Sequence, residues 1–404
     1  MRVTSTVSAA AIIVAAAGVP STACAQSSSK AESEVTVSLG GRYDGNVSRR
    51  SPAQAALLNL TPEDAVLTPN VDVHLARPVG RNLFSLDAGL GYVLYRRNTR
   101  LNREQISVDA TADLSLGPCQ LVLSPGYRRG QSDLSQIAGA FAAAAGSINN
   151  TQSTQEYAGD LRCGSRRGFR PIATISRTIG DNSNPLRRIS DYRTFSYGGG
   201  LGYSNPVIGD YSVIYNRADT TYPTRTAATG GTGFVLDRIT VSGGRSIGSG
   251  LRAAGTVSFL ALNPKQPGVR NFNSVGWSLS ATLLPTPDLQ LQLETSRDIK
   301  PSLGSDALFQ VFRSYSLNAA YAFSSSTRAS VGGSINEVTY NGAGTTFGPA
   351  LTNSVQYSAT GSVTQDFGRR LGLTAELGYD RRNANGSLFD YDRFFAGLKL
   401  IFRI

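Results

Sequence analysis

The 404-residue sequence has few of the residue types on which most catalytic and metal sites depend. It contains one His, one Trp, three Cys and one Met, which is the initiator. A single histidine argues against a His-rich metal site, and no G-x-S-x-G elbow, phosphate-binding loop or Cys/His metal-ligand spacing occurs. We therefore expect no cofactor, and enzymatic chemistry has little to build on.

Long hydrophobic runs are also missing. A polytopic helical membrane protein needs repeated runs of about 20 apolar residues, and none appears after the first two dozen positions. The sequence does contain 16 Phe and 17 Tyr besides many aliphatic residues, so general disorder is excluded as well.

The one apolar run lies at the N-terminus and has the features of a secretory signal peptide. Arg2 precedes the apolar stretch 9–19, and an A-x-A cleavage site follows it. We expect removal of residues 1–25 and export of residues 26–404. The run is too short for a membrane anchor, and a lipoprotein modified at Cys24 is the remaining alternative.

Residues 35–404 alternate apolar and polar side chains in stretches of about 10 to 14 residues, separated by Gly, Pro, Asn, Asp and Ser clusters. The clearest stretches are 105–116, 288–300 and 353–367. Side chains with a period of two lie on opposite faces of a sheet. The pattern predicts one all-β domain with no linker.

Strand and connection lengths favour a membrane barrel over a soluble β-sandwich. Sandwich strands usually have five or six residues, whereas these are long enough for a tilted bilayer crossing. Short connections also alternate with longer ones, as in outer-membrane barrels with short periplasmic turns and long outer loops. The short connections are 78–81, 117–118, 164–168, 206–209, 246–249, 285–287, 324–326 and 368–369, and the longer ones include 44–67, 132–152, 181–191, 223–233, 263–271 and 341–352.

This alternation predicts a closed antiparallel transmembrane β-barrel of about 18 strands, running from near Val35 to Arg403. The even number places both ends on the periplasmic side, and closure leaves no edge strand. Pro125 within 120–129 and the irregular stretch 169–180 fit the pattern poorly, so we allow 16 to 18 strands.

The last stretch, 391–404, resembles the C-terminal assembly signal of outer-membrane barrels. It departs from that signal in ending with Ile404 instead of Phe. We expect a protein of the outer membrane of a Gram-negative bacterium, with outer-membrane lipid, lipopolysaccharide and the barrel assembly machinery as partners.

Four segments carry a family resemblance: GGRYDGNV at 40–47, GLGY at 89–92, GGGLGY at 198–203 and GYDRRNANGSLFDYDR at 378–393. They resemble the β-barrel porin 2 family, whose members often accompany bacterial exopolysaccharide secretion systems. The resemblance implies a role in export of a surface polysaccharide, with polysaccharide export proteins as further partners. A general diffusion porin for small solutes is the alternative, because composition and periodicity indicate only a barrel.

Arginine dominates the positive charge: the net charge is +11, and only four of the basic residues are Lys. Many arginines fall at the expected outer ends of strands or in outer loops. The candidate ligand-binding residues among them are Arg96, Arg97, Arg100, Arg103, Arg187, Arg188, Arg381, Arg382 and Arg393, with Arg128, Arg129 and Arg193 nearby. Guanidinium groups bind phosphate and carboxylate bidentately, so this collar fits either an acidic glycan leaving the pore or lipopolysaccharide phosphates. No nucleic-acid-binding motif accompanies it, and we expect no nucleic-acid partner.

The expected inner face carries charges of both signs. The candidate lumen charges are Asp72, Asp87, Asp109 and Asp113 on three neighbouring strands and Arg238 and Arg252 on later ones. They could set up a transverse field that orients solutes, or form ion pairs that stiffen a narrow barrel. About 18 strands suffice for an aqueous channel, although the alanine-rich loop 138–145 could fold inward and narrow it.

His74 is the only imidazole, and it shares a face with Asp72. An Asp-His pair could orient a water molecule in a hydrolase. We favour instead a polar lumen residue that hydrogen-bonds its neighbours, and we expect no enzymatic activity.

The two cysteines of the exported chain test the strand assignment. Cys119 begins the strand after the turn 117–118, and Cys163 ends the strand before the turn 164–168. Their midpoint falls inside the loop 132–152, as pairing across a hairpin requires. Cross-strand Cβ atoms lie about 4.5 to 5.5 Å apart, close to disulfide distance. In the oxidising periplasm we expect a disulfide on the outer face, with two unpaired thiols at the rim as the alternative.

Overall fold

The computed structural model describes residues 31–132, 134, 148–164, 167–226, 231–266, 268–301, 307–342, 351–386 and 389–404. The expected signal peptide and the alanine-rich loop 138–145 lie outside these residues. Within the part described, no helix is both long and apolar enough to span a bilayer.

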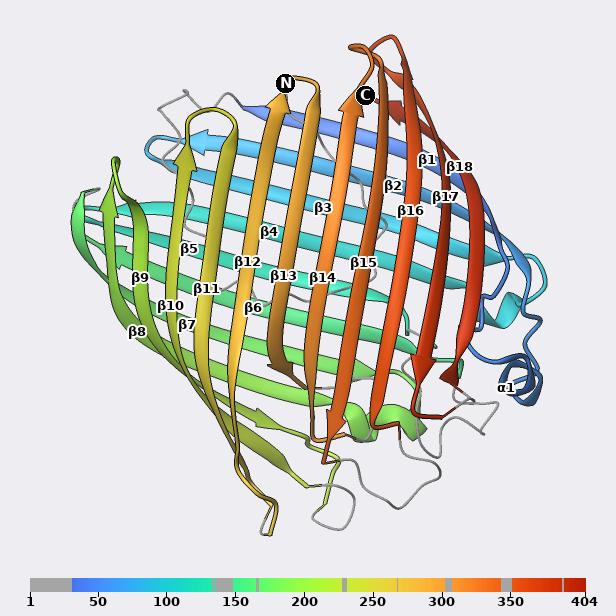
Figure 1. Cartoon of the computed structure of the whole chain (residues 1–404), viewed down its shortest axis with the longest axis horizontal. Helices are drawn as coiled ribbons and strands as arrows, with labels where there is room; N and C mark the ends of the chain where they lie inside the picture. The colour runs from blue at the N-terminus through green and yellow to red at the C-terminus, as the bar shows by residue number, and fades with distance from the viewer. Residues whose placement is uncertain are drawn as a thin grey trace.

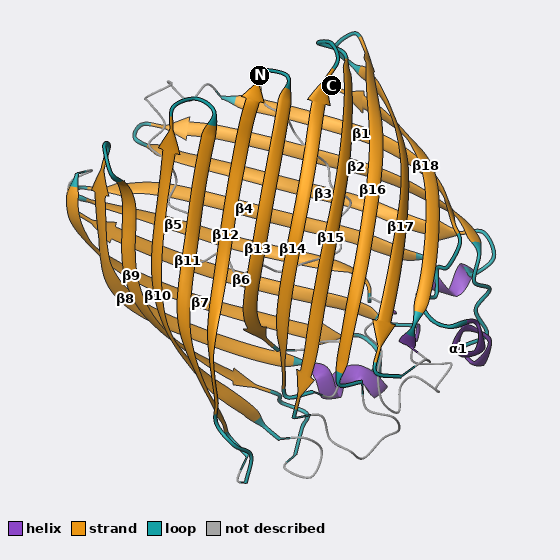
Figure 2. Cartoon of the chain, in the orientation of Figure 1, coloured by secondary structure: helices purple, strands orange, loops and turns teal. Residues whose placement is uncertain are grey.

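The described chain forms 18 β-strands in one antiparallel sheet (Figure 1). Their bounds are β1 (Glu32–Asp44), β2 (Asp64–Val79), β3 (Asn82–Tyr95), β4 (Arg103–Leu116), β5 (Cys119–Gln131), β6 (Thr151–Cys163), β7 (Gly168–Asn182), β8 (Tyr192–Asn205), β9 (Gly209–Thr221), β10 (Gly233–Ile247), β11 (Leu251–Pro264), β12 (Phe272–Thr286), β13 (Leu289–Lys300), β14 (Phe309–Ala322), β15 (Thr327–Asn341), β16 (Asn353–Phe367), β17 (Leu371–Ala384) and β18 (Tyr391–Arg403). Short helices α1 (Pro52–Leu57), η1 (Thr99–Leu101) and η5 (Pro185–Ser190) lie in the connections. Figure 2 shows that most of the described chain is β-strand.

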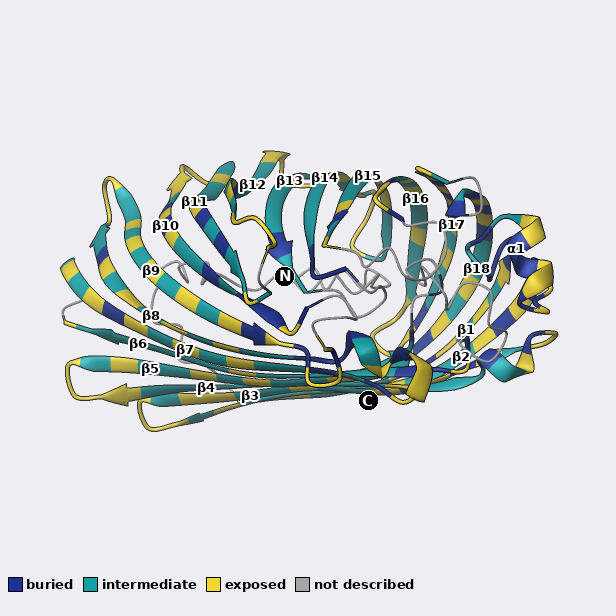
Figure 3. Ribbon diagram, turned by 90° about the horizontal axis from the view of Figure 1, so that it is seen from below, coloured by how far each residue is buried: buried dark blue, intermediate teal, exposed yellow. Residues whose placement is uncertain are grey.

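Each strand pairs with its neighbours in the chain, and β1 also pairs with β18, so the sheet closes into a barrel. Figure 3 shows the closed wall as a flattened ring, with β3–β8 on one side and β11–β17 on the other. The closed antiparallel barrel expected from the sequence is confirmed, and its strand count is the upper value of the expected range.

The two stretches that fit the sequence pattern poorly are strands β5 and β7. Because Pro125 has no backbone N–H to donate, the β4–β5 ladder is interrupted at Ser124 and Pro125 and resumes at Gly126 in the same register. On its other edge β5 pairs continuously with β6, where Pro125 lies opposite Tyr157. The irregular stretch in β5 therefore coincides with a local gap in one of its two ladders, whereas β7 pairs without interruption with both β6 and β8.

The outer face of the barrel is apolar. Leu90, Phe259 and Val331 point outward and are each at least 60% exposed. On the side of the long loops, this band is flanked by exposed tyrosines, namely Tyr43, Tyr92, Tyr157, Tyr197, Tyr215, Tyr315, Tyr357 and Tyr379. On the side of the short turns, it is flanked by the exposed aromatic rings of Phe84, Phe169, Tyr211, Tyr321, Phe323, Phe367 and Phe402. An apolar belt between two aromatic girdles is the signature of an outer-membrane barrel.

Connection lengths give the barrel its orientation. Turns of two to four residues join the strands at the end where the described chain begins and finishes, and loops of six to 19 residues join them at the opposite end. At two tight turns, Gly80 and Gly117 adopt φ of 62°, a backbone conformation that favours glycine. Because short turns are periplasmic and long loops external, the short-turn end faces the periplasm.

A buried ion-pair network crosses the seam where the first and last strands meet. Arg393 on β18 donates to both carboxylate oxygens of Asp44 on β1, at 2.7 and 2.8 Å, and to Asp380 on β17, at 2.7 Å. Its guanidinium also lies 4.7 Å from the centroid of the Phe395 ring. Side chains of Arg393 and Asp44 are each only 4% exposed, so this cation holds three strands together at the closure point.

We predict that Arg393→Met destabilises the folded barrel by about 3 to 5 kcal/mol, because it leaves buried Asp380 without its cation and leaves Asp44 only the longer contact with Arg42, at 3.4 Å. The urea midpoint of the heat-modifiable folded band on gels measures the loss. Arg381→Met is the matched control: Arg381 lies on the exposed outer face, 3.8 Å from Asp392, and such exposed pairs contribute about 1 kcal/mol or less. Equal losses in the two variants would contradict the role of the seam.

Cys119 and Cys163 lie directly opposite each other in the β5–β6 register and are joined by a disulfide. Both residues have outward parity, together with Leu123 and Tyr157, whose side chains are exposed. The bond closes the periplasmic end of the hairpin whose outer end is the loop beginning at Ser132.

We predict that the exported protein carries this bond as a covalent cross-link. Non-reducing peptide mass spectrometry with prior alkylation should find the Cys119 and Cys163 peptides linked, and reduction should release them. Alkylation of both thiols without reduction would show that the bond does not form.

Candidate functional site: the lumen and its outer mouth

The inner face of the barrel is lined by polar and charged side chains. The parity that points Leu90 outward points Asp87 inward, and the register carries this assignment from strand to strand around the ring. All six expected lumen charges have inward parity, namely Asp72, Asp87, Asp109, Asp113, Arg238 and Arg252. A polar inner face inside an apolar belt forms the wall of a water-filled lumen.

An acidic strip crosses β2, β3 and β4. Asp87 and Asp109 lie directly opposite each other on adjacent strands, although like charges at such positions repel. Arg128 on β5 partly offsets this repulsion, with its guanidinium 3.2 Å from Asp109. Side chains of Asp87 and Asp109 are 63% and 49% exposed, so their charge is available to ions in the lumen.

His74 pairs with a different acid from the one we expected. It lies opposite Asp87 on β3, with 2.5 Å between Nδ1 and the carboxylate, whereas Asp72 accepts from Asn70 at 2.6 Å. The cross-strand neighbour takes precedence because a residue two positions along the same strand lies farther away than the one directly opposite. The pair stands exposed in the lumen wall, and the described residues place no nucleophile beside it, so the geometry gives no support to a hydrolase.

The expected lumen arginines have separate environments. Arg238 pairs with Asp298 at 2.5 Å and is mostly shielded, while Arg252 is exposed near the periplasmic end of β11. Of the two interpretations offered by the sequence, ion pairing therefore describes Arg238, and a free lumen charge describes Arg252.

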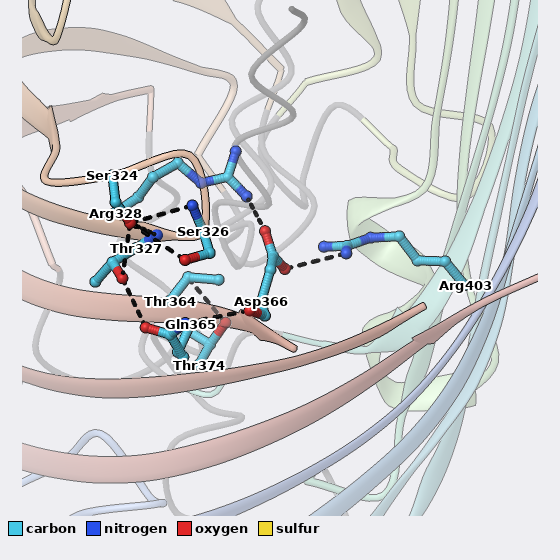
Figure 4. Close-up of polar contacts among 9 residues, drawn as sticks. All are labelled: Ser324, Ser326, Thr327, Arg328, Thr364, Gln365, Asp366, Thr374 and Arg403. Atoms are coloured by element: carbon cyan, nitrogen blue, oxygen red, sulfur yellow. Dashed lines mark hydrogen bonds and ion pairs between the residues drawn. The ribbon is translucent and has the colours of Figure 1, made fainter. Parts of the chain in front are cut away.

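The sequence reasoning missed a charged cluster near the periplasmic mouth (Figure 4). Asp366 on β16 accepts from Arg328 on β15 and from Arg403 on β18, both at 3.1 Å. Its carboxylate reaches across β17 above Gly372, where a Cβ would lie only 2.9 Å from it. One acid between two guanidinium groups leaves a net positive charge. Inward parity near a turn is the signal that could have identified this cluster.

The outer loops fold inward at the opposite mouth and pack against the inner wall. One apolar cluster joins inward-facing Val66 and Val93 to loop residues Val47, Leu58, Leu60, Leu101, Leu134 and Ile148. A second covers the inner wall of β8–β14 with Tyr222 and Leu308, and a third joins Ala307, Leu351 and Phe389 to Tyr340. In Figure 3 buried segments lie within the ring of strands. The main apolar packing of the described chain therefore narrows the outer mouth.

Three buried arginines bind these loops to one another. Arg50, in the β1–β2 loop, donates to the Leu134 carbonyl at 2.7 Å and lies 5.1 Å from the Phe389 ring centroid. Arg225, in the β9–β10 loop, donates to the carbonyls of Ile189 and Ala307, at 2.6 and 3.1 Å.

The third arginine completes a circuit of loops around the mouth. Arg187 of η5 donates to the hydroxyl of Ser132, which is the first residue of the β5–β6 loop that also contains Leu134. From the β5–β6 loop, contacts run through Arg50 to Phe389 in the β17–β18 loop. The third apolar cluster joins Phe389 to Ala307 in the β13–β14 loop, and Arg225 joins Ala307 to η5. We call this arrangement the loop circuit.

The expected arginine collar is only partly external. Arg96, Arg97, Arg188 and Arg381 are exposed, and Arg100 and Arg103 are half-buried with donors on backbone carbonyls. The expectation was wrong for Arg187, Arg382 and Arg393, which are at most 5% exposed and cannot reach a glycan or lipopolysaccharide. Inward parity places Arg382 and Arg393 on the lumen side, and the fold of the β7–β8 loop buries Arg187.

Most outward-facing arginines at the rim also have an acidic neighbour on the adjacent strand. The pairs are Arg129–Glu104, Arg193–Asp181, Arg217–Asp237, Arg313–Glu337 and Arg381–Asp392, at 2.7 to 3.8 Å. These exposed pairs neutralise much of the collar. The charge balance weakens the case for a surface that attracts an acidic polymer.

No group of three or more His, Cys, Asp or Glu side chains arranged to hold a metal ion occurs in the part of the chain described.

We predict that the acidic strip makes the lumen prefer cations. Replacing Asp87 and Asp109 together by Asn should lower the K⁺ to Cl⁻ permeability ratio about twofold or more, because lumen charges concentrate counter-ions. The reversal potential across a planar bilayer under a KCl gradient measures this ratio. Asp392→Asn, on the outer face, is the control and should leave the ratio unchanged. An unaltered ratio in the double variant would contradict the assignment.

The sequence matches no protein-family model and no curated protein. Among solved structures, OccK2 (OpdF) of Pseudomonas aeruginosa in complex with glucuronate is 11% identical, with 93% of this chain and 98% of that chain covered and a TM-score of 0.47. A BenF-like porin from Pseudomonas fluorescens Pf-5 is 12% identical, with coverages of 93% and 99% and a TM-score of 0.47. OccAB3 of Acinetobacter baumannii is 11% identical, with coverages of 92% and 100% and a TM-score of 0.46.

Proposed function

We propose that the protein is an outer-membrane channel through which small hydrophilic solutes diffuse. The loop circuit carries this proposal. A closed wall with a polar lining supplies an aqueous path, and loops joined by buried arginines restrict that path to small molecules. The charged groups of the acidic strip and of the Arg328–Asp366–Arg403 cluster then attract or repel ions and polar solutes in the lumen according to their charge.

Export of a surface polysaccharide, implied by the resemblance to the β-barrel porin 2 family, is less well supported. A polymer would have to separate loops that Arg50, Arg187 and Arg225 hold together, and breaking a buried hydrogen bond to a charged group costs about 1.5 to 3 kcal/mol. The rim arginines that could attract an acidic polymer are mostly paired with acids.

We predict that proteoliposomes containing the purified full chain swell in isotonic arabinose and remain unswollen in dextran. Arg50→Ala combined with Arg225→Ala should loosen the loop circuit and raise both the single-channel conductance and the size limit. His74→Ala is the control for the size limit and should exclude dextran as the wild type does, because His74 pairs with Asp87 in the barrel wall and not with the loops.

Two results would overturn the proposed function. One is a protein that is folded by heat modifiability yet passes neither ions nor arabinose. The other is a deletion strain that loses surface polysaccharide, with recovery on re-expression of the wild-type chain. The second result would support polysaccharide export instead.

A further inference from the structure

An apolar groove of about 970 Å³ lies on the outer surface over the barrel seam. It crosses β17, β18, β1, β2 and β3, which are neighbours in the closed sheet (Figure 1). Its outward-facing lining includes Phe394, Leu398, Gly41, Tyr43, Leu67 and Arg96. The groove thus opens towards the bilayer, close to the outer end of the apolar belt.

Small residues give the groove its depth. Gly41 on β1 lies opposite Leu398 on one side and Leu67 on the other. A Cβ at Gly41 would meet no atom within 4 Å, so the space above this residue is open. Leucine, phenylalanine and tyrosine side chains flank that space, and an acyl chain would bury apolar surface there.

An exposed guanidinium group lines the groove at its outer end. Arg96 faces outward directly after β3, and exposed Arg97 is the next residue in the chain, beyond the lining. Most other outward arginines at the rim have an acid on the neighbouring strand, whereas the side chain of Arg96 has no acidic partner among the described residues. The nearby Glu63 accepts from the Tyr43 hydroxyl at 3.0 Å.

We propose that this groove, with Arg96 and Arg97, is a binding site for a phosphorylated glycolipid of the outer leaflet, of the lipid A class. Arginine binds phosphate through paired N–H donors. The order of the two features sets the ligand's direction: the phosphate lies at the outer rim, and the acyl chain runs down over Gly41 towards the middle of the belt. This direction corresponds to a lipid of the outer leaflet.

The site spans the closure of the barrel. The same three strands that Arg393 joins from the lumen side, β17, β18 and β1, form much of the groove on the lipid side. A bound lipid would therefore cover the seam from outside while the ion-pair network holds it from inside.

The experiment is native mass spectrometry of the full chain in detergent with added diphosphorylated lipid A. We expect one retained lipid A, with retention reduced about tenfold by Arg96→Gln combined with Arg97→Gln, since the substitution removes charge-assisted hydrogen bonds to the phosphate. Gly41→Leu should reduce retention similarly by filling the groove without a clash. Arg177→Gln is the matched control, because Arg177 is an exposed outward arginine that does not line the groove, and it should retain lipid A as the wild type does.

Three outcomes would overturn the proposal. Equal retention by the Arg96/Arg97 variant and the wild type would remove the phosphate site. Equal retention of dephosphorylated lipid A or of phosphatidylglycerol would remove the specificity for an outer-leaflet phosphorylated glycolipid. A dimer that Gly41→Leu abolishes, without lipid retention by the wild type, would make the groove an interface between copies. Heat modifiability of each variant verifies that it is folded.

Discussion

The pairing of β1 with β18 is the constraint on which the rest of the structure depends. Within a bilayer no water can satisfy a strand edge, so every backbone N–H and C=O in the belt needs a partner in the sheet. Eighteen antiparallel strands meet this requirement only when the last strand joins the first. The lumen, the apolar belt and the two mouths all follow from that closure.

Side chains reinforce this closure at its outer end. The first and last strands lie at opposite ends of the sequence. The side chains at their junction form a buried network around Arg393. The barrel has no solid core, and its other main apolar packing lies where the loops turn inward. Stability is therefore concentrated at the seam and at the outer mouth, and the wall between them depends on its hydrogen-bond ladders.

Much of this architecture was predictable, because a period of two and the spacing of turns determine face and register. The clear stretch 105–116 lies in β4, and 353–367 is β16. The positions of two turns and one loop predict that Cys119 lies opposite Cys163, as it does. Parity also places Arg393 beside outward-facing Phe394 and so on the lumen side. Its position near a strand end nevertheless fits the collar interpretation, and only the direction of its side chain excludes it.

Contacts between distant loops were not predictable. Nothing in the sequence relates Arg50 to Leu134 or Arg225 to Ala307, since these residues have no common period and the chain between them passes through several strands. The hydrogen-bond partner of His74 was also not predictable: it is Asp87 on the adjacent strand and not Asp72, which is close in sequence. Such pairings depend on three-dimensional proximity that local pattern does not encode.

The loop circuit also determines where the cell-surface end of the protein tolerates alteration. A peptide inserted into a loop of the circuit would displace contacts shared with two neighbouring loops, so the disturbance would spread around the mouth. Among the described residues, the connection between β11 and β12 supplies none of the arginine contacts or apolar-cluster side chains that form the circuit, and its Lys265 pairs with Asp219 on β9. This connection is the natural place to display an epitope or a label on the living cell.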